Sequence, residues 1–137
     1  MKKVLGIMLL TVSTFLLFGC EAGRTTASGL GTVTLEVYGA DGVLVASEAV
    51  PFDQGDTLLG LVRATFETYC ADAEGDPDAS CGYVGAYGVY LVGIAGVIAD
   101  DANEYIAFYV DGEYATSGID STAVTDGAVY AFKLETF

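Results

Sequence analysis

Few side chains in this chain could carry out catalysis. There is no histidine among the 137 residues, which excludes acyl transfer by a serine or cysteine with a histidine base. Asp100 and Asp101 are adjacent carboxylates, the residue type that cleaves glycosides. Neighbouring acids in a turn are far more often solvated than catalytic. We therefore expect no catalytic residue and no enzymatic activity.

The N-terminal residues indicate a covalent modification. Lys2 and Lys3 precede an apolar stretch over residues 4–18, which ends at Gly19 and Cys20. A positive start, a short apolar region and a small residue before the cleavage point are the features of a secretory signal. With a cysteine directly after Gly19, the segment resembles a bacterial lipoprotein signal peptide. The resemblance implies cleavage of residues 1–19 and a diacylglycerol on the Cys20 thiol.

Two other interpretations of this segment remain, an uncleaved transmembrane helix and an ordinary secretory signal with a chance cysteine. The apolar run is at the short end of the ~17–25 residues that a spanning helix needs. Thr11, Ser13 and Thr14 dilute it further. The lipoprotein interpretation places the chain on the extracellular side of the cell membrane, which it contacts through the lipid on Cys20.

The charge balance limits the partners. Asp and Glu number 19 against 5 Lys and Arg, which gives a net charge of −14. Such a charge argues against nucleic acid and against an anionic membrane surface as partners. Solubility is the simplest explanation for it, and a cationic ligand, calcium or a basic protein remains compatible with it.

Cys70 and Cys81 are expected to form a disulfide, because an even pair of cysteines in an exported protein usually does. Closing so short a loop stabilises a fold by about 3 kcal/mol. Metal ligation is less favoured, because the chain has no histidine and no second cysteine pair. Two free thiols are the other alternative.

The pattern of side chains predicts one domain after a flexible tether over residues 20–31. Residues 32–38 alternate apolar with polar side chains, which is typical of a strand, and Asp41-Gly42 predicts a hairpin into residues 43–50. Pro51 and Gly55 are expected to end that strand. A helix capped by Asp56 or Thr57 is expected over residues 58–69. Further strands are predicted over residues 87–98, 105–110 and 128–134, with turns at Asp111-Gly112 and Asp126-Gly127.

This order of elements predicts an α+β fold of the β-grasp (ubiquitin-like) type, with a mixed sheet of about five strands packed on a single helix. The first and last strands would lie side by side at its centre. An immunoglobulin-like sandwich is the main alternative, but it has about seven strands and no place for an amphipathic helix.

A set of short segments carries a resemblance to a known family. In chain order they are residues 33–39 (VTLEVYG), 50–52 (VPF), 55–59 (GDTLL), 87–90 (YGVY), 105–114 (YIAFYVDGEY), 118–120 (GID) and 125–127 (TDG). Residues 32–137 thereby resemble the DUF4430-type domains of Gram-positive lipoproteins and surface proteins, which are similar to the C-terminal domain of transcobalamin and intrinsic factor. The resemblance implies a β-grasp domain that binds a soluble ligand, with cobalamin or another corrinoid as the ligand to consider. In the vertebrate proteins a large helical domain supplies the other wall of the site, and this chain has none.

Tyrosines are the candidate binding residues. Alternation along residues 105–110 directs Ile106, Phe108 and Val110 to the core, so that Tyr105 and Tyr109 lie on the opposite face. Exposed tyrosines combine apolar area with a hydroxyl group, as binding surfaces do. Burial of the same face under loops is an equal alternative. The ligand-binding residues that we predict are Tyr87, Tyr105, Tyr109 and Tyr114.

The acidic segment at Asp72, Glu74, Asp76 and Asp78 could in principle bind calcium through its oxygen atoms. Gly75 and Pro77 do not fit the order of a calcium-binding hand, which favours a solvated loop, and we expect no metal site. The function that we expect is an extracellular, lipid-anchored binding domain for an unidentified small ligand. The alternative is a protein-interaction or cell-envelope architecture domain.

Overall fold

The computed structural model describes residues 29–100 and 102–137. Cys20, residues 1–19, Asp101 and most of the expected tether therefore lie outside the described residues. Within residues 29–100 and 102–137, no helix is both long and apolar enough to cross a membrane.

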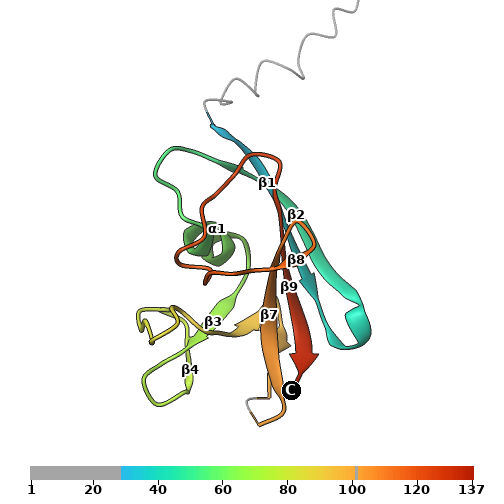
Figure 1. Cartoon of the computed structure of the whole chain (residues 1–137), viewed down its shortest axis with the longest axis vertical. Helices are drawn as coiled ribbons and strands as arrows, with labels where there is room; N and C mark the ends of the chain where they lie inside the picture. Colours follow the sequence, from blue (N-terminus) through green and yellow to red (C-terminus); the bar gives the residue numbers. More distant parts are fainter. Residues whose placement is uncertain (1–28, 101) are drawn as a thin grey trace, which may run out of the picture.

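The main sheet is mixed and has five strands in the order β2-β1-β9-β7-β8 (Figure 1). The first and last of its strands in the sequence, β1 and β9, are parallel neighbours, with Thr34 opposite Val129 and Tyr38 opposite Lys133. This confirms the predicted pairing of the two chain ends. The strands are β1 (Gly31–Tyr38), β2 (Leu44–Phe52), β7 (Glu104–Val110), β8 (Glu113–Tyr114) and β9 (Val129–Thr136).

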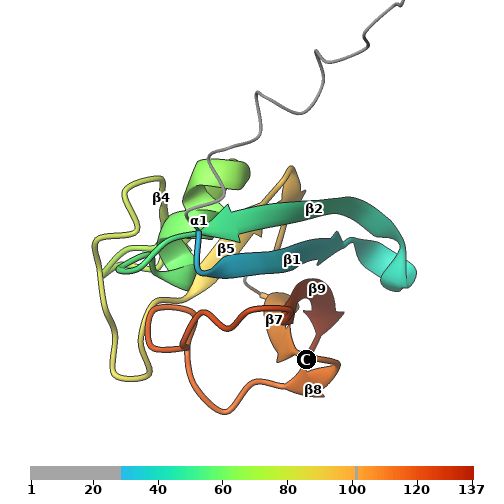
Figure 2. The same ribbon diagram turned by 90° about the horizontal axis from the view of Figure 1, so that it is seen from above.

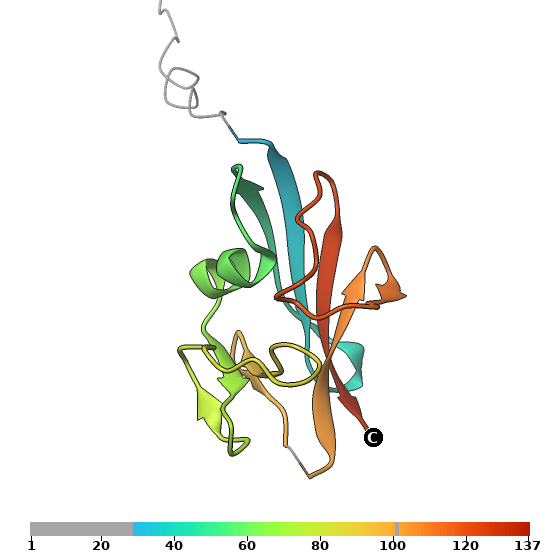
Figure 3. The ribbon, with the colours of Figure 1, turned by 60° about the vertical axis from the view of Figure 1, so that its left-hand side comes forward.

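A second sheet of four short strands lies beside the helix α1 (Leu58–Thr65), and Figure 3 shows both on the same side of the main sheet. The strand order is β4-β3-β5-β6. The sequence does not predict this separate sheet. Its strands are β3 (Thr68–Ala71), β4 (Pro77–Asp78), β5 (Leu91–Ile94) and β6 (Val97–Ile98).

Alternation along β1 explains how the main sheet forms a core. Val33, Leu35 and Val37 are at most 1% exposed, and they face the same side as Tyr130 and Phe132 of β9. The Asp-Gly turn is confirmed: the short 3-10 helix η2 (Ala40–Gly42) joins β1 to β2, and Asp41 and Gly42 have positive φ angles there. A positive φ suits glycine and is tolerated by aspartate.

The predicted bounds of three elements are wrong. The strand expected over residues 87–98 is two short strands, β5 and β6, which pair with each other across a turn. The helix stops at Thr65 and not at Tyr69, because Thr68 and Tyr69 pair with Ile94 and Gly93 of β5. The strand β2 continues through Pro51 to Phe52. Proline lacks a backbone donor, and it is tolerated there because β2 is an edge strand.

The helix begins as predicted from its capping residue. The Thr57 hydroxyl oxygen accepts a hydrogen bond from the Gly60 N–H at 3.1 Å, which satisfies one of the free donors of the first turn. Leu58 and Val62 are fully buried against the main sheet. The helix is therefore fixed by its apolar face as well as by its cap.

The disulfide between Cys70 and Cys81 is confirmed, with an S–S distance of 1.98 Å. Cys70 lies in β3 and is fully buried, and Cys81 is 6% exposed. The bond closes the acidic loop that follows β3, and Arg63 of the helix donates a hydrogen bond to the Ala79 carbonyl of this loop at 3.1 Å. Metal ligation and free thiols are thereby ruled out for this pair.

The connection between β8 and β9 is long, and Figure 2 shows it as a wide loop. Tyr130 anchors it: its hydroxyl donates a hydrogen bond to the Ala123 carbonyl at 2.8 Å and accepts one from the Thr125 N–H at 3.0 Å. Tyr130 is only 1% exposed. A core side chain thus holds a surface loop through a buried hydroxyl group.

We predict that Tyr130→Phe lowers the free energy of unfolding by about 1–3 kcal/mol, because two part-buried hydrogen bonds to the hydroxyl are lost, each contributing roughly 0.5–1.5 kcal/mol. Urea unfolding of the full chain measures the loss. Tyr83→Phe is the matched control, because Tyr83 is 45% exposed. An equal loss in the two variants would contradict this role of the Tyr130 hydroxyl.

Candidate functional site

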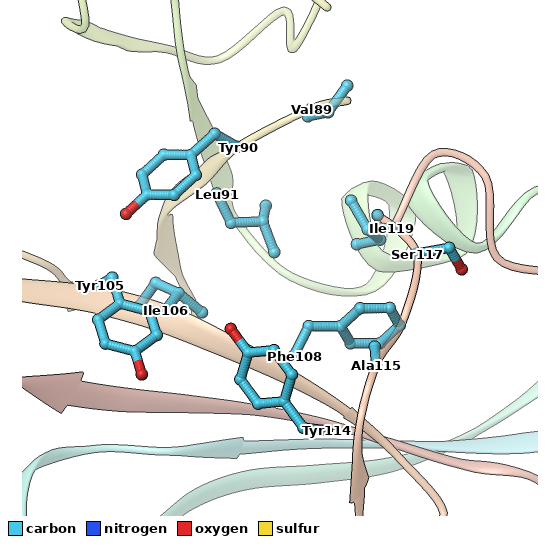
Figure 4. Close-up of a pocket in the computed structure, with 11 residues that line it drawn as sticks. Val89, Tyr90, Leu91, Tyr105, Ile106, Phe108, Tyr114, Ala115, Ser117 and Ile119 are labelled. Atoms are coloured by element: carbon cyan, nitrogen blue, oxygen red, sulfur yellow. The ribbon is translucent and has the colours of Figure 1, made fainter. Parts of the chain in front are cut away.

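A pocket of about 160 Å³ lies between β7, the start of β5 and the loop that follows β8 (Figure 4). Its floor is apolar and consists of Leu91, Ile106, Phe108 and Ile119. Leu91, Ile106 and Ile119 are at most 7% exposed, and Phe108 is partly buried. The floor is therefore part of the hydrophobic core, and only the rim meets solvent.

Tyrosine rings from three separate segments form the rim: Tyr90 precedes β5, Tyr105 belongs to β7 and Tyr114 belongs to β8. Figure 4 shows the Tyr90 ring across the pocket from the rings of Tyr105 and Tyr114. Tyr90 and Tyr114 are 49% and 60% exposed. Burial raises the pKa of Tyr90, so its hydroxyl stays neutral and can donate a hydrogen bond. The rim thus offers aromatic faces and the hydroxyl group of Tyr90 to a ligand.

Glu135 fixes two tyrosines on the outer face of the main sheet. Its carboxylate accepts hydrogen bonds from the hydroxyls of Tyr105 at 2.9 Å and Tyr109 at 2.6 Å. The bond to Glu135, followed by burial, raises the pKa of Tyr109 to about 12. The Lys133 ammonium lies 4.5 Å from the ring centre of Tyr109 and 5.1 Å from that of Tyr38. Cation–π contacts of this kind hold the lysine on the outer face.

The structure brings together only part of the tyrosine set predicted from the sequence. Tyr105 and Tyr114 line the pocket. Tyr109 lies on the outer face as predicted, and its ring meets that of Tyr114 edge-on at 5.4 Å. Tyr87 is 98% exposed at the turn between Gly85 and Gly88 and does not line the pocket.

The list of predicted binding residues does not include Tyr90 and Ile119, which both line the pocket. Tyr90 belongs to the same tyrosine-rich half of the chain, but nothing in its spacing distinguishes it from Tyr87. Ile119 lies within the GID segment, which is one of the segments that carry the family resemblance. That resemblance was the sequence feature that pointed to Ile119. Both enter the site through contacts between segments that are distant in sequence.

Asp120 holds the two loop segments of the site together. Its Oδ1 accepts a hydrogen bond from the Val89 N–H at 3.0 Å. A methyl group at Gly88 or Gly118 would lie 2.6 Å or 2.8 Å from the same oxygen, which is too close. The glycines therefore allow the carboxylate to fit between the two segments. This contact fixes the Tyr90 wall relative to Ile119.

The acidic segment after β3 satisfies its own backbone. The Asp72 carboxylate accepts hydrogen bonds from the N–H groups of Glu74 at 2.9 Å and Asp76 at 2.8 Å. In residues 29–100 and 102–137, no group of three or more His, Cys, Asp or Glu side chains is placed to hold a metal ion. The geometry gives this loop a turn-forming role.

The family model described as Domain of unknown function (DUF4430) matches residues 55–136, which is more than half of the chain. The chain belongs to this family. A search of curated proteins gave no match.

Two solved structures share the fold. A proposed metal-binding protein from Ruminococcus gnavus aligns over 78% of this chain and 98% of its own, with 20% identity and a TM-score of 0.54. Haptocorrin in complex with Cbi aligns over 78% of this chain, with 15% identity and a TM-score of 0.53. The match spans 25% of the haptocorrin chain. The likeness to haptocorrin supports the resemblance to the C-terminal domain of transcobalamin.

The raised pKa of Tyr109 predicts a loss of stability at high pH. An ordinary tyrosine releases its proton near pH 10, and Tyr109 in the folded chain does so near pH 12. Above pH 10 the unfolded state loses a proton that the folded state keeps, so the stabilisation is complete below pH 10 and is lost as the pH rises through 12. Tyr109→Phe should therefore show a shallower decline of unfolding free energy between these pH values.

Urea unfolding at a series of pH values from 10 to 12 measures this decline. Tyr87→Phe is the control and should follow the parent chain, because Tyr87 is 98% exposed. If the unfolding free energy of Tyr109→Phe and of the parent chain declines equally with pH, the hydrogen bond to Glu135 does not raise the pKa of Tyr109.

Proposed function

We propose that this chain is a non-enzymatic binding domain, held by a lipid on Cys20 at the extracellular side of the cell membrane of a Gram-positive bacterium. The sequence pattern up to Cys20 supports the anchor. The disulfide between Cys70 and Cys81 fits an exported protein, because disulfides persist in oxidising surroundings. The domain occupies residues 32–137, after a tether over residues 20–31.

The observation that carries the binding function is the tyrosine-rimmed pocket. An apolar floor with a few polar groups at its rim is the usual composition of a small-molecule site. At about 160 Å³ the pocket is smaller than the ~300–1,000 Å³ of most ligand sites. It has room for a ring or a branched apolar group and not for a whole corrinoid. A corrinoid would place one edge here and would need a partner to cover the rest.

The neighbours named above give this proposal its ligand candidates. Haptocorrin is described in complex with Cbi, which favours a corrinoid-like ligand. The Ruminococcus gnavus protein is described as metal-binding. In the present chain the Asp72 carboxylate of the acidic loop accepts backbone hydrogen bonds and shapes a turn. Our proposal therefore includes no metal. For the fold we propose the β-grasp type, supported by the β1-β2-α1 order and by the parallel pairing of β1 with β9.

We propose that the domain has no catalytic activity, because the side chains that usually carry out catalysis are missing or engaged elsewhere. The chain has no histidine, and Cys70 and Cys81 are joined in a disulfide. Lys133 is held between tyrosine rings on the outer face, away from the pocket. None of these groups is placed to act as a nucleophile or a general base in the pocket.

A protein-interaction role is the second candidate. The exposed rings of Tyr87 and Tyr114 favour it, because exposed aromatic side chains are enriched at protein interfaces. The strongly acidic composition would then select a basic partner.

We predict that indole binds the pocket of the full chain in detergent micelles, as a probe for an aromatic group. Amide chemical shifts should move in a saturable way at Leu91, Ile106 and Ile119. Tyr90→Ala and Tyr114→Ala should each weaken binding about threefold to tenfold, since an aromatic contact contributes ~0.5–1.5 kcal/mol. Tyr87→Ala is the control and should bind as the parent chain does.

Cobinamide, tested in the same way, distinguishes the ligand classes. Shifts at the pocket with cobinamide would support a corrinoid ligand, and shifts with indole alone would support a smaller aromatic one. If neither probe moves these amides, the small-ligand function is wrong and the protein-interaction role is the better proposal.

The anchor is tested separately. We predict that the full chain, expressed in a Gram-positive host, incorporates an alkyne-tagged fatty acid and that Cys20→Ser does not. The double variant Cys70→Ala/Cys81→Ala is the control and should keep the label, because Cys70 and Cys81 are joined in the disulfide of the parent chain and do not carry the lipid. Labelling of Cys20→Ser would contradict lipidation at this residue.

A further inference from the structure

Part of strand β7 is an open edge of the main sheet. Residues 104–110 pair with β9 on one side, from Glu104 opposite Thr136 to Val110 opposite Tyr130. On the other side β8 pairs only with Tyr109 and Val110. Within the described residues, no strand pairs with residues 104–108 on that side.

Two hydrogen bonds fix the direction of the backbone groups along this edge. The Glu104 N–H donates to the Asp100 carbonyl at 2.6 Å, and the Ala115 N–H donates to the Phe108 carbonyl at 2.9 Å. Both bonds are made on the side away from β9. Because backbone groups alternate in direction along a strand, the N–H and carbonyl of Ile106 point to the same side.

The residue directly after β7 fits this alternation. The Asp111 N–H at the end of the strand donates to the Val129 carbonyl at 2.8 Å, on the side of β9. Among the described residues, the backbone of Ile106 has no bond to a turn or loop. The N–H and the carbonyl of Ile106, a residue that is 7% exposed, therefore make no hydrogen bond to a strand, turn or loop on this side within the described residues.

This edge opens into the tyrosine-rimmed pocket. Ile106 and Phe108 line the pocket from β7, and Tyr90 and Leu91 face them from the other wall, as Figure 4 shows. An apolar cavity of about 150 Å³ is large enough to hold benzene. The hollow of about 160 Å³ beside the edge therefore has room for one apolar or aromatic side chain.

The charges around the edge favour a basic occupant. Glu104 and the exposed Glu113 lie at its two ends, and Glu135 lies beside Tyr105. The nearby ammonium of Lys133 is held on the outer face by Tyr38 and Tyr109. A second copy of this chain would bring a second set of carboxylates against the first, which is unfavourable.

We propose that the open edge of β7 at Ile106 binds an extended, basic peptide segment as an added strand, with one apolar or aromatic side chain of the peptide in the pocket. In this mode main-chain hydrogen bonds give affinity and the pocket gives specificity. The proposal rests on the binding function proposed above, because it names the ligand class of the same pocket.

Hydrogen exchange of the full chain in detergent micelles tests the edge directly. Without peptide, the Ile106 amide should exchange faster than the Ala107 amide, which faces β9. On saturation with an acetylated Lys-Val-Phe-Val-Lys amide peptide, exchange at Ile106 should slow by about tenfold or more. Strong protection of Ile106 at all concentrations without peptide would overturn the proposal. Protection that grows with protein concentration would identify a second copy as the occupant and would also overturn it.

Two N-methylated peptides test the added strand. Methylation of the Phe amide or of the preceding Val amide removes donors that point to opposite sides of an extended peptide. One of the two peptides should bind about tenfold more weakly and the other should bind like the parent peptide. Equal binding of both would overturn the strand geometry.

Glu113→Lys tests the charge, with Glu74→Lys in the acidic loop as its control. Glu113→Lys should weaken binding of the basic peptide about threefold to tenfold, and Glu74→Lys should not. Equal effects of the two variants would overturn the local role of the edge carboxylates.

If indole binds and the peptide does not protect Ile106, this proposal fails and the pocket remains a small-ligand site. If neither binds, both proposals fail.

Discussion

The parallel pairing of β1 with β9 is the contact on which the rest of the structure depends. It joins strands from the two ends of the described chain, and every other element lies in the connection between them. The start of β1 is tied to the turn before β9, because the Thr32 N–H donates to Asp126 Oδ1 at 2.9 Å and the Gly127 N–H donates to the Thr32 carbonyl at 2.8 Å. Closing so long a connection costs conformational entropy. The fully buried inner faces of β1 and β9 offset that cost.

The same pairing determines the two faces of β7, which lies on the other side of β9. Register with β9 places Tyr105 opposite Glu135 and Ala107 opposite Lys133 on the outer face. Ile106 and Phe108 then face the core, next to the aromatic side chains of Tyr130 and Phe132. A shift of one residue would exchange the faces. The tyrosine and glutamate network and the apolar floor of the pocket thus follow from a single register.

Much of the fold could be predicted from local patterns, and the errors are instructive. The alternation in residues 32–38 predicts β1 correctly, and the Asp-Gly turns predict the hairpins at residues 41–42 and 111–112 correctly. The apolar spacing that starts the helix continues to Tyr69, yet the chain changes to a strand after Thr65. Thr68 and Tyr69 favour strands when a partner is available, and β5 supplies one from more than twenty residues away. Helical spacing alone does not reveal that partner.

Residue types and local spacing were enough to predict the acidic charge, the pairing of Cys70 with Cys81, the capped start of the helix at Thr57, and the outward direction of Tyr105 and Tyr109. These properties depend on residue types and on spacing within one element. Tertiary structure alone decided that Tyr90 and Ile119 join Tyr105 and Tyr114 around one pocket, and that Tyr87 stays outside it. It also decided that β8 is too short to cover Ile106. These features arise where β5, β7 and the loop after β8 meet, and contacts between distant segments depend on packing and register, which no local pattern encodes.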